Sequence, residues 1–314
     1  MIDVIIPAHI KDIETLDLSI DGIRSSVKDL RKIYVVSKDR LTEKAEWIPE
    51  SYFPFSLEDV SSMIGKHWRT CWYYQQLLKL YSVFAHDDVL DAVLCTDSDT
   101  IFLKETKFYD DGVAYFNIGK EEYPPYFEHM SMLLPGLRRM TEHSGITHHM
   151  VFQKDLLESL FSDVEKVHGM PFWQAFLETI TNDYKTIIGD KSIANGQGRA
   201  SEYEIYFNYC MMKHPERMKI RKLKSILAYK EELSDDQEYH TIGSRTNDDQ
   251  HIRIIDESDV PDFENVEESF LYAINRCREL DYDSVTFQKH TRQGLEEYKR
   301  DGEKYIMDTA DDTN

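Results

Sequence analysis

The chain has 314 residues, 41% of them hydrophobic and 12% aromatic, which is enough apolar material for a large folded core. Its formal net charge is -21, so sequence-independent binding to nucleic acid and docking on an anionic membrane surface are both disfavoured. The same charge repels phosphate-bearing ligands. A ligand of that kind would need local cations or a bound metal ion.

The cysteines and the amino terminus bear on the cellular compartment. Cys71, Cys95, Cys210 and Cys277 are widely spaced and form no CxxC pair, which favours free thiols in a reducing compartment over a zinc site or a disulfide framework. Residues 1–12 lack the basic region and the length of a signal peptide, and the chain contains no apolar run of about 18 residues. We therefore expect a cytoplasmic protein without a transmembrane segment.

The predicted elements of residues 1–104 alternate between strand and helix. Short β-rich runs at 2–8 and 32–37 flank a segment with apolar residues at helical spacing, which predicts a βαβ unit with a parallel sheet. Residues 68–85 predict a long, partly buried helix, and 92–96 a third strand. Residues 1–104 therefore favour a Rossmann-like half, whose ligand crevice lies at the carboxyl ends of the strands.

The remainder, 105–300, has weaker patterns. Residues 105–150 are irregular and rich in aromatic residues, proline and glycine. Further elements are predicted as helices at 151–168 and 172–181, separated by a break at Gly169 to Pro171, a helix at 201–214, a strand at 251–255, a helix at 266–279 and a strand at 284–290. We expect one α/β domain over 1–300, a Rossmann-like mixed sheet flanked by helices, and a disordered acidic tail at 301–314.

The segment LCTDSDTIFL carries the clearest chemical signal. It places Asp97, Ser98 and Asp99 directly after the third predicted strand. Two carboxylates at this spacing suit Mg²⁺ or Mn²⁺ bridging a diphosphate, because both ions prefer oxygen ligands. The alternative is a turn in which the aspartates cap backbone amides. No other Asp-x-Asp triplet in the chain follows a buried strand, so we favour the metal site.

A family resemblance rests on five segments: IIPAH, WYYQQLLKL, TDSDTIFL, HHMVF and SEYEIYFNY. Together they resemble the GT-A glycosyltransferases, and more narrowly the DUF6492 family of sugar transferases from bacteria and large viruses. The resemblance implies a GT-A fold with a nucleotide-sugar-binding half at 1–104 and an acceptor-side half at 105–300. It also implies transfer of a hexosyl or pentosyl group from a nucleotide-sugar, with UDP-sugar favoured and GDP-sugar possible, to a glycan or glycoconjugate hydroxyl with Mn²⁺ or Mg²⁺ as cofactor.

The resemblance also implies where the donor binds. Asp99 would be the principal metal ligand, and Asp97 would assist it or hold the ribose. A further metal ligand is expected from His290, with His240 as second choice. Gln76 and Lys79 share a helix face, which suits hydrogen bonds to the donor but equally a solvated edge. The donor-binding set is Pro7, Ala8, His9, Gln75, Gln76, Lys79, Asp97 and Ser98.

Acceptor binding and catalysis are expected from two later segments. His148 and His149 are adjacent, so in an extended segment only one faces the substrate, and the other is as readily a buried histidine. Ser201 and Glu204 match a capping box, which would occupy Glu204 and leave Glu202 free. An inverting transfer needs a carboxylate to remove the acceptor proton, so we expect Glu202 as the catalytic base and Glu204 as the reserve.

Two other functions remain open at this stage. A nucleotidyltransferase of the same fold usually carries a Gly-rich basic loop after the first strand, and IPAHIKDIE has none. A non-catalytic carbohydrate-binding protein would use the aromatic segment YFNIGKEEYPPYF equally well, because aromatic rings stack on sugars.

Overall fold

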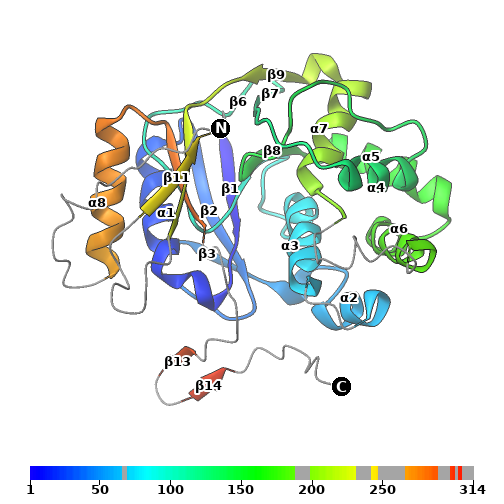
Figure 1. The fold of residues 1–314 in the computed structure, drawn as a ribbon, viewed down its shortest axis with the longest axis horizontal. Coiled ribbons are helices and arrows are strands. Elements are labelled where there is room, and N and C mark those ends of the chain that lie inside the picture. Colours follow the sequence, from blue (N-terminus) through cyan, green and yellow to red (C-terminus); the bar gives the residue numbers. More distant parts are fainter. Residues whose placement is uncertain are drawn as a thin grey trace. The chain divides into compact units, whose positions relative to one another are not determined.

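The computed structural model describes residues 1–65, 69–187, 199–230, 242–246, 266–288, 298–300 and 303–305. The chain forms two compact units that interleave along the sequence (Figure 1). Unit 1 consists of Met1–Pro7, Asp29–Thr96 and Lys107–Lys222, and unit 2 of Ala8–Lys28, Asp97–Thr106 and Leu223–Asn314. Within the described residues, no helix is long and apolar enough to span a membrane.

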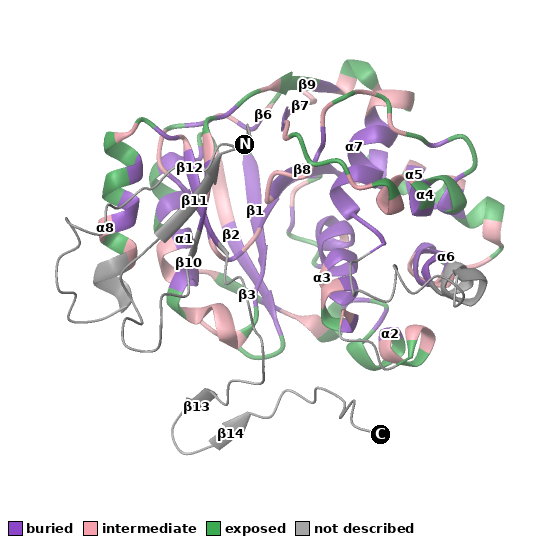
Figure 2. Cartoon of the chain, viewed as in Figure 1, coloured by how far each residue is buried: buried purple, intermediate pink, exposed green. Residues whose placement is uncertain are grey.

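A five-stranded mixed sheet forms the centre of unit 1, with the strand order β3-β2-β1-β4-β8. β1 pairs in parallel with β2 and with β4, and β8 pairs antiparallel with β4. Every residue of β1 and β4 is buried (Figure 2), which explains why both are mainly apolar, with Asp3 and Thr96 as the polar exceptions. The strand bounds are Ile2–Pro7 (β1), Leu30–Ser37 (β2), Glu46–Pro49 (β3), Ala92–Thr96 (β4) and His149–Gln153 (β8).

The helices of unit 1 include α3, which packs against β1, and α5, which packs against β8. α5 ends at Gly169, whose φ of 68° is the left-handed conformation that glycine adopts readily, as the predicted break requires. The bounds are Leu57–Ile64 (α2), Thr70–Leu80 (α3), Pro124–Leu133 (α4), Lys154–His168 (α5), Phe172–Ile187 (α6) and Glu202–Lys213 (α7), with a small sheet of Tyr109–Asp110 (β6), Val113–Asn117 (β7) and Met218–Arg221 (β9).

Unit 2 has its own sheet, in the order β11-β10-β12-β5, and its own core. Helix α1 packs against β5 at Gly22, where a Cβ atom would lie 2.8 Å from Cγ2 of Ile101. The bounds are Ile10–Asp12 (η1), Ile13–Ser26 (α1), Thr100–Phe102 (β5), Ser225–Lys230 (β10), Ile242–Thr246 (β11), Val266–Glu279 (α8), Ser284–Gln288 (β12), Tyr298–Arg300 (β13) and Glu303–Tyr305 (β14).

The expected fold class, an α/β fold with a mixed sheet flanked by helices, is confirmed. Three expectations differ from the structure. Residues 151–153 belong to strand β8, because three consecutive apolar residues at 150–152 are all buried in the sheet and the helix starts only at Lys154. Residues 124–133 within the irregular region form α4, and 303–305 of the tail form a strand. The strand expected at 251–255 lies outside the described residues.

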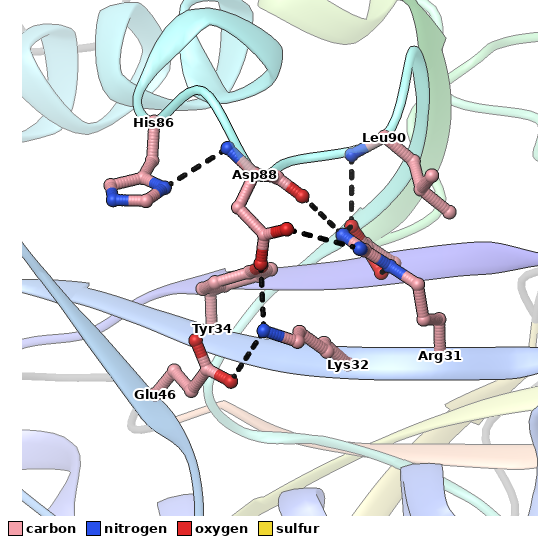
Figure 3. Close-up of polar contacts among 8 residues, drawn as sticks. Arg31, Lys32, Tyr34, Glu46, His86, Asp88 and Leu90 are labelled. Carbon is pink, nitrogen blue, oxygen red and sulfur yellow. Dashed lines mark hydrogen bonds and ion pairs between the residues drawn. The ribbon is translucent and has the colours of Figure 1, made fainter.

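An ion-pair network joins β1, β2 and the loop before β4 at the amino side of the sheet (Figure 3). Asp3 is fully buried, and its carboxylate accepts hydrogen bonds from Nε of Arg31 at 2.8 Å and from the amide of Leu90 at 2.9 Å. Arg31 also contacts the carboxylate of Asp88, which in turn pairs with Lys32 at 2.7 Å. The network therefore fixes strands whose opposite ends carry the candidate site.

We expect Asp3→Asn to lower the free energy of unfolding by about 3 kcal/mol, because it leaves the guanidinium of Arg31 without its buried partner. Urea unfolding followed by circular dichroism measures this loss. Glu46→Gln is the matched control, since it removes the exposed end of the same network, where Glu46 pairs with Lys32. The control should cost less than about 1 kcal/mol, and an equal loss in both variants would contradict the assignment.

The hydrogen bonds from Lys32, Tyr34 and Arg31 lower the pKa of Asp88 to about 2. In the unfolded chain an aspartate has a pKa of about 3.9. Asp88 therefore stabilises the fold fully above about pH 4, and this contribution is lost as the pH falls towards 2. We expect the difference in urea midpoint between wild type and Asp88→Asn to be constant from pH 7 to 4 and to shrink below it. A difference that does not change between pH 4 and 2 would contradict this expectation.

Candidate active site

The site begins at the carboxyl edge of the unit 1 sheet. β1 lies between β2 and β4, so the strand order reverses next to β1, which is the place where open α/β sheets bind ligands. Ile5 of β1 lies opposite Cys95 of β4, and the two strands end at Pro7 and Thr96. Predicted site residues follow both strand ends in the chain: Ala8 and His9 after β1, and Asp97 to Asp99 after β4.

The Asp-Ser-Asp triplet is the turn that connects β4 to β5. The amide of Thr100 donates to the carbonyl of Asp97 at 3.2 Å, and the amide of Phe287 donates to the carbonyl of Asp99 at 2.9 Å. Ser98 is buried, whereas Asp97 and Asp99 are half-buried. Main-chain bonds thus hold the turn backbone, and the two aspartate residues are half-buried, with Oδ1 of Asp97 shielded from solvent.

The Asp-Ser-Asp turn offers two carboxylates as ligands for a divalent ion. Mg²⁺ is usually held by one or two carboxylates together with substrate phosphates, and not by a complete protein cage. Asp97 and Asp99 match that pattern. In the parts of the chain that the structure describes, no group of three or more His, Cys, Asp or Glu could hold a metal ion. His290 and His240 lie outside the described residues, so their metal roles stay predictions.

At the end of β1, Pro7 and Ala8 are buried, and His9 is exposed. Nδ1 of His9 accepts a hydrogen bond from the amide of Lys11 at 3.3 Å, so this ring caps the short helix η1. Binding of a nucleotide by these residues stays a prediction.

The two adjacent histidines differ in their surroundings. His149 is opposite Thr96 in the sheet, and its buried ring packs in a T-shaped arrangement against Phe108, with the ring centroids 5.4 Å apart. His148 is half-buried and has a φ of 61°, a conformation that costs energy in any residue other than glycine and that recurs at functional sites. The hydroxyl of Thr96 donates to the carbonyl of His148 at 3.4 Å. Of the pair, His148 is therefore the more accessible residue, and substrate binding by either histidine stays a prediction.

Helix α3 holds the chain segment that enters α7. The side chains of Tyr73, Gln76 and Lys79 follow one another at intervals of three residues on one helix face. Tyr73 Oη accepts a hydrogen bond from the amide of Arg199 at 3.2 Å. Gln76 donates to the carbonyl of Ala200 at 3.0 Å and accepts from the amide of the first α7 residue at 3.1 Å.

The carboxylate of Glu202 is paired with Lys79. Nζ of Lys79 lies 2.8 Å from Oε1 of Glu202, both side chains are almost fully buried, and the ammonium also lies 4.6 Å from the centre of the Tyr203 ring. The expectation that Glu202 is free is therefore wrong. Gln76 and Lys79 do share a face, as predicted, but that face is buried against 199–202 and is not a solvated edge. Gln75 is half-buried.

Glu204 forms only one of the two hydrogen bonds of the predicted capping box. Its amide donates to Oγ of Ser201 at 3.3 Å, which confirms the first half of the capping box. Its carboxylate, however, accepts from Oγ of Ser144 at 2.5 Å and from Nδ2 of Asn208 at 2.9 Å, in place of the predicted bond to the Ser201 amide. Burial raises the pKa of Glu204. Glu204 thus fixes the 144–146 loop to α7.

Four partners of this site were missed by sequence reasoning: Tyr73, Ser144, Arg199 and Asn208. Tyr73 could have been found, because it lies three residues before Gln76 on the same helix face, and Asn208 lies four residues after Glu204. Ser144 reaches Glu204, and Arg199 reaches Tyr73, only through tertiary folding, so no local pattern marks these contacts.

Comparison with known proteins gives remote similarities. No protein-family model and no curated protein matches this chain. Mouse xyloside xylosyltransferase 1, apo form, is similar over 70% of this chain and 84% of its own, at 12% identity and a TM-score of 0.38. The galactosyltransferase LgtC in complex with donor and acceptor sugar analogues is similar over 65% of this chain and 85% of its own, at 12% identity and a TM-score of 0.34. An active-site variant of LgtC is similar over 75% of this chain and 81% of its own, at 11% identity and a TM-score of 0.38.

At these TM-scores the similarity carries no argument about activity. The α/β class rests on the strand order and register of this chain. Membership of the DUF6492 family stays a prediction.

Proposed function

We propose that this chain is a metal-dependent glycosyltransferase of the GT-A type that transfers a sugar from a nucleotide-sugar to a glycan hydroxyl. One observation carries the proposal. The half-buried Asp97 and Asp99 lie on a turn that directly follows β4 in the chain and whose backbone is held by main-chain bonds, and β4 is the strand at which the strand order reverses. An acidic chain of net charge -21 needs a cation to hold a diphosphate, and this turn offers two oxygen ligands for it.

Asp97 and Asp99 would hold Mn²⁺ or Mg²⁺, and the bound ion supplies charge stabilisation to the departing diphosphate. We assign Asp99 as the principal ligand and Asp97 to the ion or the ribose. Ser98, the β1 end at Pro7 to His9, and Gln75 complete the proposed donor-binding set. UDP-sugar is the favoured donor and GDP-sugar the second choice.

Glu202 is the proposed base of an inverting reaction. Glu204 is committed to Ser144 and Asn208, so of the two carboxylates Glu202 is the better candidate. Lys79 fixes its Oε1 at 2.8 Å, and we assign Oε2 to the acceptor hydroxyl. As the acceptor oxygen bonds to the anomeric carbon, the bond from that carbon to the diphosphate breaks and the hydroxyl proton passes to Glu202. His148 or His149 is proposed to bind substrate hydroxyls.

The direct test is incubation with a panel of UDP- and GDP-sugars and Mn²⁺, followed by measurement of the nucleotide released. A glycosyltransferase without acceptor usually hydrolyses its donor slowly, so we expect release that stops when EDTA is added. Sugar binding without nucleotide release would instead identify a carbohydrate-binding protein. Pyrophosphate formed from a nucleoside triphosphate and a sugar phosphate would identify a nucleotidyltransferase.

A further inference from the structure

A group of aromatic rings in unit 1 has no part in the reaction proposed above. Trp72 of α3 lies 6.4 Å from Tyr126 of α4, and Tyr126 lies 4.8 Å from Tyr123, with all distances between ring centroids. Each of these three residues is half-buried, so part of its surface remains accessible. We call Trp72, Tyr123 and Tyr126 the aromatic platform.

The platform differs from the aromatic packing of the unit's interior. The stacked rings of Tyr81, Phe161 and Phe172 are all buried and hold α3, α5 and α6 together. In the platform, tyrosine and tryptophan combine an apolar ring with a polar group and keep exposure, as they do in binding surfaces. The guanidinium of Arg69 lies 4.9 Å from the centre of the Trp72 ring.

The charges beside the platform restrict what it can bind. Glu121 and Glu122 are exposed immediately before Tyr123, and Glu122 pairs with Arg139 at 2.6 Å. Carboxylates accept strong hydrogen bonds from hydroxyl groups but repel phosphate, sulfate and carboxylate ligands. The guanidinium of Arg69 and the pairing of Glu122 with Arg139 balance these carboxylates, so charges of both signs border the rings. Such a surface fits a neutral sugar, whose apolar ring face stacks on an aromatic ring while its hydroxyls donate to the carboxylates.

The two helices next to the platform, α3 and α4, both pack against α7, whose first residue is Glu202. Burial and the negative charges of Glu121 and Glu202 raise the pKa of Tyr126. Tyr73, the residue after Trp72, binds the amide of Arg199, whose Nη2 lies 3.4 Å from Glu128 on α4. The entry to α7 thus lies beside both platform helices.

We propose that the aromatic platform is a subsite for a neutral sugar ring of the acceptor glycan, a role that rests on the proposed glycosyl transfer. The substrate class is an uncharged oligosaccharide that stacks on Trp72 or Tyr126 and donates hydroxyl hydrogens to the neighbouring carboxylates. Its position beside Glu202 would bring an adjacent hydroxyl of the acceptor to the base.

The test is titration of the full chain with lactose, maltose, N,N′-diacetylchitobiose and xylobiose, followed by tryptophan fluorescence. The chain has four tryptophans, so Trp72→Phe assigns the signal and Trp47→Phe, at an exposed tryptophan on β3, is the matched control. We expect a saturable change with at least one disaccharide in wild type and in Trp47→Phe, and its loss in Trp72→Phe. Tyr126→Ala should raise the dissociation constant of the disaccharide roughly 3- to 10-fold. Calorimetry measures this change independently of tryptophan fluorescence.

The proposal is overturned if none of the four sugars gives a saturable change up to the solubility limit. It is also overturned if Trp72→Phe keeps the signal, or if folded Tyr126→Ala binds as wild type does. Should Tyr126→Ala fail to fold, Tyr126→Leu replaces it, since leucine fills the space without an aromatic face. If saturable sugar binding occurs but wild type releases no nucleotide from any nucleotide-sugar, the platform stands and the proposed transfer fails.

Discussion

Asp99→Ala is expected to lower metal-dependent nucleotide release roughly 10³-fold or more, because it removes the principal ligand of the ion that stabilises the leaving diphosphate. The turn itself should persist, since the carbonyl of Asp99 and not its side chain accepts the hydrogen bond from Phe287. Steady-state release from the preferred nucleotide-sugar measures the effect. Calorimetry with UDP in the presence of Mn²⁺ should show that nucleotide affinity falls at the same time.

Asp91→Ala is the matched control for this substitution. Asp91 immediately precedes β4, whereas Asp97 and Asp99 follow it, and its side chain is 88% exposed. The control should release nucleotide at the wild-type rate. Full activity of Asp99→Ala, or of wild type in EDTA, would contradict the role given to the triplet.

The buried Lys79–Glu202 pair is expected to produce the second large effect. Lys79→Met and Glu202→Gln each leave one buried group without its charged partner, so each should lower the free energy of unfolding by about 3–5 kcal/mol. Glu202→Gln should in addition lower kcat by roughly 10²–10⁴-fold, because glutamine cannot accept the acceptor proton. Urea unfolding and acceptor-dependent turnover measure the two effects separately.

The double variant Lys79→Met/Glu202→Gln separates anchoring from catalysis. It contains no buried unpaired charge, so a large part of the lost stability should return, while kcat should stay as low as in Glu202→Gln alone. If turnover returns together with stability, Glu202 only anchors α7 to α3 and the base lies elsewhere. Lys166→Met, at the exposed pair with Asp163, is the control and should cost less than about 1 kcal/mol.

Most of the sheet could be predicted because its strands have local signals. β1 and β4 are short apolar runs that end at Pro7 or at the acidic triplet, and both were found with nearly their observed bounds. β8 was missed because an apolar run as short as 150–152 fits a buried strand and the start of a helix equally well, and the pairing with β4 decides between them. α4 begins with Pro124 and Pro125, which mask its helical pattern although proline is well tolerated in the first turn.

In the candidate site, features set by residues close together in the sequence could be predicted, and contacts between residues far apart in the sequence could not. The turn position of Asp97 to Asp99 follows from the strand before it, and the hydrogen bond between Ser201 and Glu204 follows from their spacing. The pairing of Glu202 with Lys79 joins residues far apart in the sequence, so no spacing rule could reveal it. The role of Glu202 as a base therefore stays a prediction, and the expectation that its carboxylate is free was wrong.

A crystal structure of the chain with UDP and Mn²⁺, with the manganese located by its anomalous scattering, tests the proposed metal site. We expect manganese bound to the carboxylate of Asp99, with the diphosphate completing its coordination and the nucleotide at the carboxyl ends of β1 and β4. Manganese or nucleotide bound elsewhere, with both aspartates of the triplet away from it, would show that the proposed site is wrong.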